Sequence, residues 1–221
     1  SGISSNGLFG TVLSSQVNSG AIGDGGDLTI KTGNLTARDG GVVQTDTFGN
    51  GNAGNLSIIA ENIELSGTSP DSSFGTVLSS QVNPGAIGDG GDLTIETGNL
   101  TARDGAVVQT GTFGNGNAGN LSIIAENIEL SGISSNGLFG TVLSSQVNSG
   151  AIGDGGDLTI KTGNLTARDG GVVQTDTFGN GNAGNLSIIA ENIELSGTSP
   201  DSSFGTVLSS QVNPGAIGDG G

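Results

Sequence analysis

The chain contains no cysteine, histidine, tryptophan, tyrosine or methionine. Without cysteine it can form neither a disulfide framework nor a thiolate metal site. Five lysine and arginine residues stand against 21 aspartate and glutamate residues, so the formal charge is −16. We expect such a chain to be repelled by nucleic acid and by anionic membranes. Its apolar runs are only a few residues long, and we expect no insertion into a membrane.

Glycine is abundant: 44 of the 221 residues, against a usual share of about 7%. These glycines follow no three-residue collagen period, so their number favours many tight turns. Proline is scarce, and no stretch carries the 3.6-residue apolar period of a helix. Glycine and β-branched residues are also poor helix formers.

The sequence repeats itself with a period of 65 residues. Residues 1–65 recur unchanged at 131–195, residues 66–130 are a close variant, and residues 196–221 repeat the start of that variant. We interpret residues 1–221 as one continuous repeat segment. Because it begins within the pattern, we expect it to be a fragment of a longer chain or filament.

A weaker repeat lies inside each 65-residue unit. GDGGDLTIKTGNLTA (23–37) aligns with GNAGNLSIIAENIEL (51–65) at an offset of 28, and the next offset is 37. The extra nine residues of the longer spacing are placed around residues 68–76. Each repeat therefore predicts two coils, of 28 and 37 residues.

Apolar and polar residues alternate over short runs such as Leu28-Thr29-Ile30, Leu35-Thr36-Ala37 and Val43-Gln44-Thr45. This period of two predicts strands, three short ones per coil. Nearly identical units with short strands indicate an all-β fold, a parallel β-helix (β-solenoid) in which like residues stack. The predicted core columns are Leu28/Leu56/Leu93, Ile30/Ile58/Ile95 and Leu35/Ile63/Leu100.

Two polar columns accompany the core, and both are predicted to form ladders of stacked amides. A polar binding stripe is the functional alternative for each. The asparagine column contains Asn34, Asn62, Asn99, Asn127, Asn164 and Asn192. The glutamine column contains Gln16, Gln44, Gln81, Gln109, Gln146, Gln174 and Gln211.

The acidic residues at the glycine-rich corners alternate with asparagine. Asp24 aligns with Asn52 and then Asp89, and Asp27 follows the same rule. This alternation doubles the distance between stacked charges from ~4.8 Å to ~9.6 Å, near the Debye length. We infer that the spacing helps the fold to tolerate its acidity.

The motifs GNAGNLSI (51–58), TFGNGNAG (47–54) and the Asp-Gly before a short Val/Gln strand (39–45) carry a family resemblance. The repeats resemble those of large filamentous-haemagglutinin-like exoproteins, of the cyanobacterial type secreted by the two-partner route. The resemblance spans essentially the whole chain. It implies a right-handed β-helix, export across the outer membrane, and a role in surface adhesion or fibre formation.

Three kinds of chemical site, for nucleotides, for catalysis and for calcium, can be weighed from the residues. Gly23-Asp24-Gly25-Gly26 lacks the third glycine and the following helix of a dinucleotide fingerprint, and its carboxylates would repel a phosphate. Catalysis needs one place unlike the others, which a perfect repeat does not offer, so we expect no enzyme and no cofactor. A calcium-binding β-roll stays open as a weak alternative. Its candidate ligands are Asp24, Asp27, Asp89, Asp92, Asp154 and Asp157.

Two functions remain. The chain is expected to be a structural component of a secreted, cell-surface filament, which grows by continuation or by end-to-end stacking with itself. Alternatively, it is an adhesin stalk whose inserted loop binds a cell-surface or polysaccharide receptor. The candidate binding loop contains Thr68, Pro70, Asp71, Phe74, Thr198, Pro200, Asp201 and Phe204.

Overall fold

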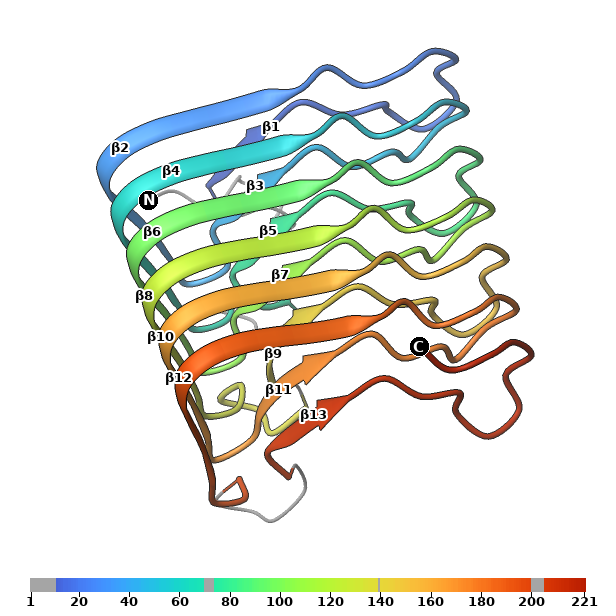
Figure 1. Ribbon diagram of the computed structural model, residues 1–221. Helices are drawn as coiled ribbons and strands as arrows, with labels where there is room; N and C mark the ends of the chain where they lie inside the picture. The colour runs from blue at the N-terminus through green and yellow to red at the C-terminus, as the bar shows by residue number, and fades with distance from the viewer. Residues whose placement is uncertain (1–10, 70–73, 139, 200–204) are drawn as a thin grey trace.

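The computed structural model describes residues 11–69, 74–138, 140–199 and 205–221, which contain strands and no helix. The strands form two parallel sheets that wind together into a β-solenoid (Figure 1). One sheet has six long strands in the order β12-β10-β8-β6-β4-β2, and the other has seven short strands in the order β1-β3-β5-β7-β9-β11-β13. This confirms the predicted fold class.

Each long strand has 11 residues. They are β2 (Leu28–Arg38), β4 (Leu56–Ser66), β6 (Leu93–Arg103), β8 (Leu121–Ser131), β10 (Leu158–Arg168) and β12 (Leu186–Ser196). The short strands are β1 (Val12–Ser14), β3 (Val42–Gln44), β5 (Val77–Ser79), β7 (Val107–Gln109), β9 (Thr141–Ser144), β11 (Gly171–Gln174) and β13 (Val207–Ser209).

The register of the long strands confirms the two coil lengths. Leu28 pairs with Leu56 and Leu56 pairs with Leu93, at offsets of 28 and 37 residues. The three predicted apolar columns are stacked in this register, and Leu56, Ile58 and Ile63 are almost completely buried. Burial of such side chains, worth about 1.5–3 kcal/mol each, stabilises the stack.

The prediction of three short strands per coil is wrong, because one long strand replaces two of them. In β6 the buried residues are Leu93 and Ile95 and then Leu100 and Ala102. The alternation therefore changes phase near Asn99, and a strand that changes phase must bend to keep both halves facing the core. Figure 1 shows this bend as the curve of the long strands at one edge of the molecule.

The placement of the nine extra residues also needs correction. The offset between paired residues is 28 at Ser66, 35 at Val77 and 37 at Ile87. Seven extra residues therefore lie between Ser66 and Val77, and two more lie between Val82 and Ile87. The second insertion forms a turn, in which the Ala86 amide donates to the Asn83 carbonyl at 2.9–3.0 Å in the equivalent coils.

Candidate functional site

The asparagine column forms an unbroken hydrogen-bonded ladder at the bend of the long strands. Asn62 donates from Nδ2 to Asn34 Oδ1 at 3.0 Å, and Asn99 donates to Asn62 at 2.8 Å. Asn127, Asn164 and Asn192 continue the same direction at 2.8–2.9 Å. Each side-chain amide between the two ends of the ladder thus uses a donor and an acceptor within it, although the residues are solvent-exposed.

A second ladder runs along the glycine-rich corners and explains the alternation of aspartate and asparagine. The backbone N–H of Asn52 donates to Asp24 Oδ1 at 2.8 Å, and the backbone N–H of Asp89 donates to Asn52 Oδ1 at the same distance. The pattern continues to Asp219, and a parallel ladder starts at Asp27. Both residue types supply an acceptor oxygen, so asparagine can replace aspartate and remove a charge without loss of the bond.

Glycine is required at these corners because the coils touch through their backbones. A Cβ atom on Gly54 would overlap the carbonyl oxygen of Gly26, and one on Gly119 would overlap that of Gly91. Gly51 also has a φ of 153° and approaches Gly23 in the same way. The corner sequence GDGGD is thus a stacking surface in this fold.

The calcium candidates use one carboxylate oxygen each in this ladder. Asp24, Asp27, Asp89, Asp92, Asp154 and Asp157 all accept a backbone N–H from the next coil on Oδ1. Within the four described ranges, no group of three or more aspartate or glutamate side chains converges as a metal site would require.

The glutamine column does not form the predicted continuous ladder. Gln44 donates from Nε2 to Gln16 Oε1, and the pairs Gln109–Gln81 and Gln174–Gln146 do the same. Across the longer step, however, the backbone of Gln44 pairs with Ser79. The two-residue turn after Val82 restores the 37-residue offset only beyond Gln81, which makes the sequence alignment of Gln44 with Gln81 misleading. The last glutamine, Gln211, donates to Asn213 at 3.3 Å.

Asp46 is a buried carboxyl group that sequence reasoning missed. Its side chain is 2% exposed. It accepts hydrogen bonds from Ser79 Oγ at 2.8 Å and from the backbone N–H of Gln81 at 3.1 Å. Asn83 Nδ2 donates to the other oxygen at 3.3 Å. Burial raises the pKa of Asp46 to about 6, while these hydrogen bonds oppose the shift. The only available signal was the difference between Asp46 and Gly111, which gives no direction for the side chain.

Arginine–glutamate pairs lie at the C-terminal ends of the long strands. Glu64 lies between Arg38, whose nitrogen is 2.9 Å away, and Arg103 of the following coil, and Arg168 contacts Glu129. The Arg38 guanidinium, which donates a hydrogen bond to Glu64, lowers the pKa of that carboxyl group. These pairs are exposed, and such pairs contribute little to stability.

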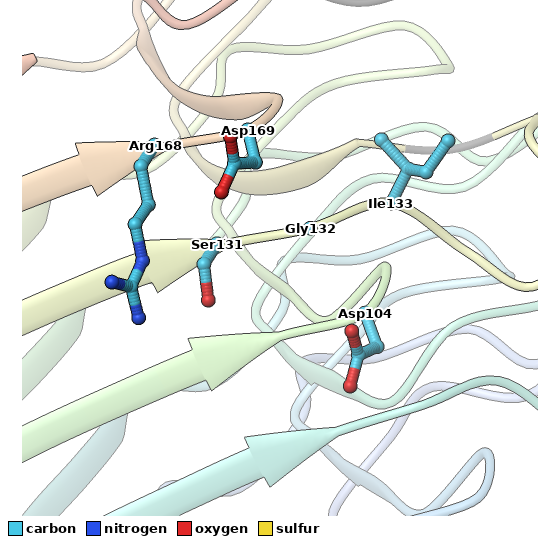
Figure 2. Close-up of a pocket in the computed structure, with 6 residues that line it drawn as sticks. All are labelled: Asp104, Ser131, Gly132, Ile133, Arg168 and Asp169. Carbon is cyan, nitrogen blue, oxygen red and sulfur yellow. The ribbon is translucent and has the colours of Figure 1, made fainter. Parts of the chain in front are cut away.

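A hollow of about 340 Å³ opens beside this row of charges. Figure 2 shows Asp104 and Asp169, from successive repeats, on opposite sides of the segment that contains Ser131 and Gly132. Asp104 and Asp169 have φ angles of 58° and 53°, and Asp39 repeats this conformation. The equivalent lining one repeat earlier keeps the aspartates, the arginine, the serine and the glycine, but Thr68 stands in place of Ile133.

The inserted loops lie between the end of a long strand and the start of the next short strand, and Ile133, which lines the hollow, is at the base of one of them. Each described loop is closed by an antiparallel bridge, Thr68 with Gly75, Ile133 with Gly140, and Thr198 with Gly205. In the first loop the Ser69 amide donates to the Phe74 carbonyl at 2.8 Å. Of the predicted binding residues, Pro70, Asp71, Pro200, Asp201 and Phe204 lie outside the described residues.

Comparison with family models, with curated proteins and with solved structures finds no match to this chain. In the described parts of the chain, no helix has the length and apolar character needed to cross a membrane. The described residues offer two kinds of candidate site, the repeated polar columns and the repeated loop.

Proposed function

We propose that this chain is a structural, non-catalytic component of a secreted filament at the cell surface, built from stacked β-coils. The observation that supports this role is the continuity of its ladders. The corner ladder joins every pair of successive coils from Asp24 to Asp219, and the asparagine ladder does the same from Asn34 to Asn192. A fold in which two ladders continue through every described coil is suited to length and stiffness.

The extracellular location rests on the resemblance of the repeats to filamentous-haemagglutinin-like exoproteins. The open edges of a sheet offer unpaired backbone groups to a further strand. Continuation of the coil, or stacking on another copy, would use these edges and extend the filament.

Negative-stain images of the native material test this proposal. We expect unbranched filaments, with strands perpendicular to the fibre axis and therefore a ~4.8 Å spacing along that axis in diffraction. Compact particles, or a ~4.8 Å spacing across the fibre, would contradict the structural role.

The second candidate function is an adhesin stalk, and the repeated loop favours it. The loop between Ser66 and Val77 interrupts the coil once per repeat, and five of the nine positions that vary between repeat versions lie at 68–73 and their equivalents. A binding residue repeated at a fixed spacing gains strength by multivalency.

Replacement of every described loop by the short connection that follows Arg38 separates the two functions. The control retains the loops but exchanges the residues of one version for those of the other. If adhesion to cells or polysaccharide is lost while filaments persist, the loop is the binder. Unchanged adhesion would eliminate the adhesin role of the loop.

A further inference from the structure

The glycine-rich turns between each short strand and the next long strand form one exposed edge of the coil. Figure 1 shows these turns on the right of the view, stacked from the blue end of the chain to the red end. Parallel bridges join them in one column, which contains Ile22, Asn50, Ile87, Asn115, Ile152, Asn180 and Ile217. We call this column, together with the aspartate two residues after each isoleucine, the isoleucine edge.

The isoleucines of this edge are exposed, although isoleucine is among the residue types most often buried. Ile87 and Ile152, which have coils on both sides, are 52% and 54% exposed. In the intervening coils Phe178 is 39% exposed, and its equivalents Phe48 and Phe113 are half-buried. An apolar row that the fold leaves uncovered along its whole length is typical of an interaction surface.

The asparagines between the isoleucines offer hydrogen-bond donors to a partner. Asn50, Asn115 and Asn180 are exposed, and their side-chain amides make no hydrogen bond within the described part of the chain. They differ in this respect from the column that starts at Asn34, whose amides bond to one another. Each free amide has two N–H groups and one acceptor oxygen.

Every charged residue in these turns is an aspartate. Residues 15–27 and 44–55, and the equivalent residues of the later coils, contain no lysine, arginine or glutamate. The nearest lysines in the sequence, Lys31 and Lys161, lie in the long strands β2 and β10. A positively charged partner is therefore complementary to this edge, whereas the same edge of a second copy would be repelled.

The carboxylates of the edge are open to such a partner. Asp24, Asp89 and Asp154 are exposed, and each accepts a backbone N–H from the next coil on Oδ1. No group in the described ranges donates to their Oδ2 atoms. Each aspartate thus keeps one oxygen for a charge-assisted hydrogen bond to lysine or arginine without leaving its ladder.

The spacing of the edge selects the conformation of the partner. Its like residues recur every second coil, at ~9.6 Å. A polyproline II segment has three residues per turn and rises about 3.1 Å per residue, so every third residue returns to the same face after about 9.3 Å. The corresponding distance is about 6.8 Å in an extended strand and about 10.5 Å for heptad-spaced residues of a helix. Over the three intervals from Ile22 to Ile217 the polyproline II segment drifts by about 1 Å, against about 3 Å for the helix.

We propose that the isoleucine edge binds a polyproline II segment of another protein in which every third residue is lysine or arginine. The basic side chains contact the Oδ2 atoms of the aspartates, and the two residues between them pack on the isoleucines. A polyproline II segment has no internal hydrogen bonds, so its carbonyl groups accept from the asparagine amides. All three contacts recur with the same period, and each further triplet of the partner therefore adds one more set.

Fluorescence anisotropy with a labelled peptide of four Lys-Pro-Pro triplets tests the spacing at about 0.05 M salt, where screening is weak. The matched control peptide has the same lysines and prolines, but its lysines are consecutive. We expect the triplet peptide to bind the full chain about tenfold more tightly than the control. Equal affinity for the two peptides would show that charge alone is recognised and would overturn the proposal, as would a triplet peptide that does not bind.

Replacement of the edge carboxylates tests where the peptide lies. The variant with asparagine at Asp24, Asp89 and Asp154 should bind the triplet peptide about tenfold more weakly, because it loses three charges and keeps every acceptor oxygen of the ladder. Asparagine already stands at the equivalent positions of alternate coils, so we expect this variant to fold, and circular dichroism verifies it.

The matched control removes the same number of charges from exposed side chains of the long strands, by glutamine at Glu61, Glu126 and Glu191. Its affinity for the triplet peptide should change less than about twofold. If it loses as much affinity as the edge variant, the peptide responds to net charge and the proposed location is wrong.

Serine substitutions test the apolar contact. Ile87→Ser combined with Ile152→Ser should weaken binding about fivefold, whereas Ile59→Ser combined with Ile124→Ser, at exposed isoleucines of β4 and β8, should not. Wild-type affinity in the first pair would overturn the proposal. The proposal does not depend on the filament role, and a chain that binds the triplet peptide but forms no filaments would contradict only the proposed function.

Discussion

Asp46 combines nearly complete burial with a pKa raised to about 6, from an ordinary value of 3.8. The Asp46 carboxyl group therefore binds a proton more tightly in the folded chain than in the unfolded chain. The stability that this proton contributes is therefore present at acidic pH and is lost as the pH rises through about 6. The shift corresponds to a loss of about 3 kcal/mol in the free energy of unfolding as the pH rises from 4 to 7.

We expect Asp46→Asn to remove this pH dependence, because asparagine keeps an acceptor oxygen for Ser79 and the Gln81 amide. Urea unfolding at a series of pH values measures the effect. Asp24→Asn, at an exposed corner, is the control and should retain the loss of stability. If the wild type and Asp46→Asn show the same change in the free energy of unfolding between pH 4 and pH 7, Asp46 does not carry the pH dependence and the prediction fails.

Buried hydroxyl groups without partners are a second feature at the residue scale. Thr47, Thr112 and Thr177 are fully buried, and their hydroxyl oxygens have no hydrogen-bond partner among the residues that the structure describes. In the same column, the alternate coils carry valine at Val82 and Val147. Valine has the shape of threonine without the hydroxyl group, so the column packs equally well with it.

We expect Thr112→Val to raise the free energy of unfolding by about 1 kcal/mol, since an unsatisfied buried polar group costs 1–3 kcal/mol. Val147→Thr, the reverse change in a neighbouring coil, should lower it by a similar amount. Thermal or urea unfolding measures both. If both substitutions destabilise the chain, the threonine hydroxyls have partners, and the reasoning fails.

At the scale of the element, the glycine-rich corner sets how closely coils approach. Gly119→Ala places a methyl group on the carbonyl oxygen of Gly91, and neither group can rotate away, because the methyl carbon is bonded directly to Cα and the oxygen is part of the backbone. We expect a loss of about 2 kcal/mol or more. The matched control is Gly33→Ala at the strand bend, where the nearest atom to the new methyl group is the Glu61 carboxylate at 3.9 Å. Its stability should change by less than about 0.5 kcal/mol.

Much of this element-scale structure could be predicted from sequence. The period of two and the repeat offsets placed Leu28, Leu56 and Leu93 in one buried column. The corner alternation of Asp24 and Asn52 was also visible, but its physical basis, a backbone N–H that needs an acceptor oxygen, was not.

The rest could not be predicted because it depends on local geometry. A bend within one strand and a turn between two strands produce the same interruption of the alternation, so the long strand was divided in two. The glutamine alignment failed because letter matching at Gln81 hides a turn that follows it. The face on which Asp46 lies depends on that same shift.

At the scale of the whole molecule, the dominant electrostatic feature is the excess of acidic residues. The five basic residues include Arg38, Arg103 and Arg168, which are held in pairs with glutamate or aspartate at one corner. The corner ladders instead carry aspartate in alternate coils, without a basic partner among the described residues. Repulsion along these ladders acts over ~9.6 Å, a distance at which salt screens exposed charges.

We therefore expect the free energy of unfolding to rise as sodium chloride increases from about 0.02 M to about 0.5 M, because screening weakens this repulsion more than it weakens the exposed ion pairs. Replacement of Asp24, Asp89 and Asp154 by asparagine gives these coils the residue that the intervening coils already have, and it keeps every acceptor oxygen. That variant should be more stable at low salt and should depend less on salt. If its salt dependence equals that of the wild type, the corner spacing already suffices to separate the charges, and the repulsion must arise elsewhere on the surface.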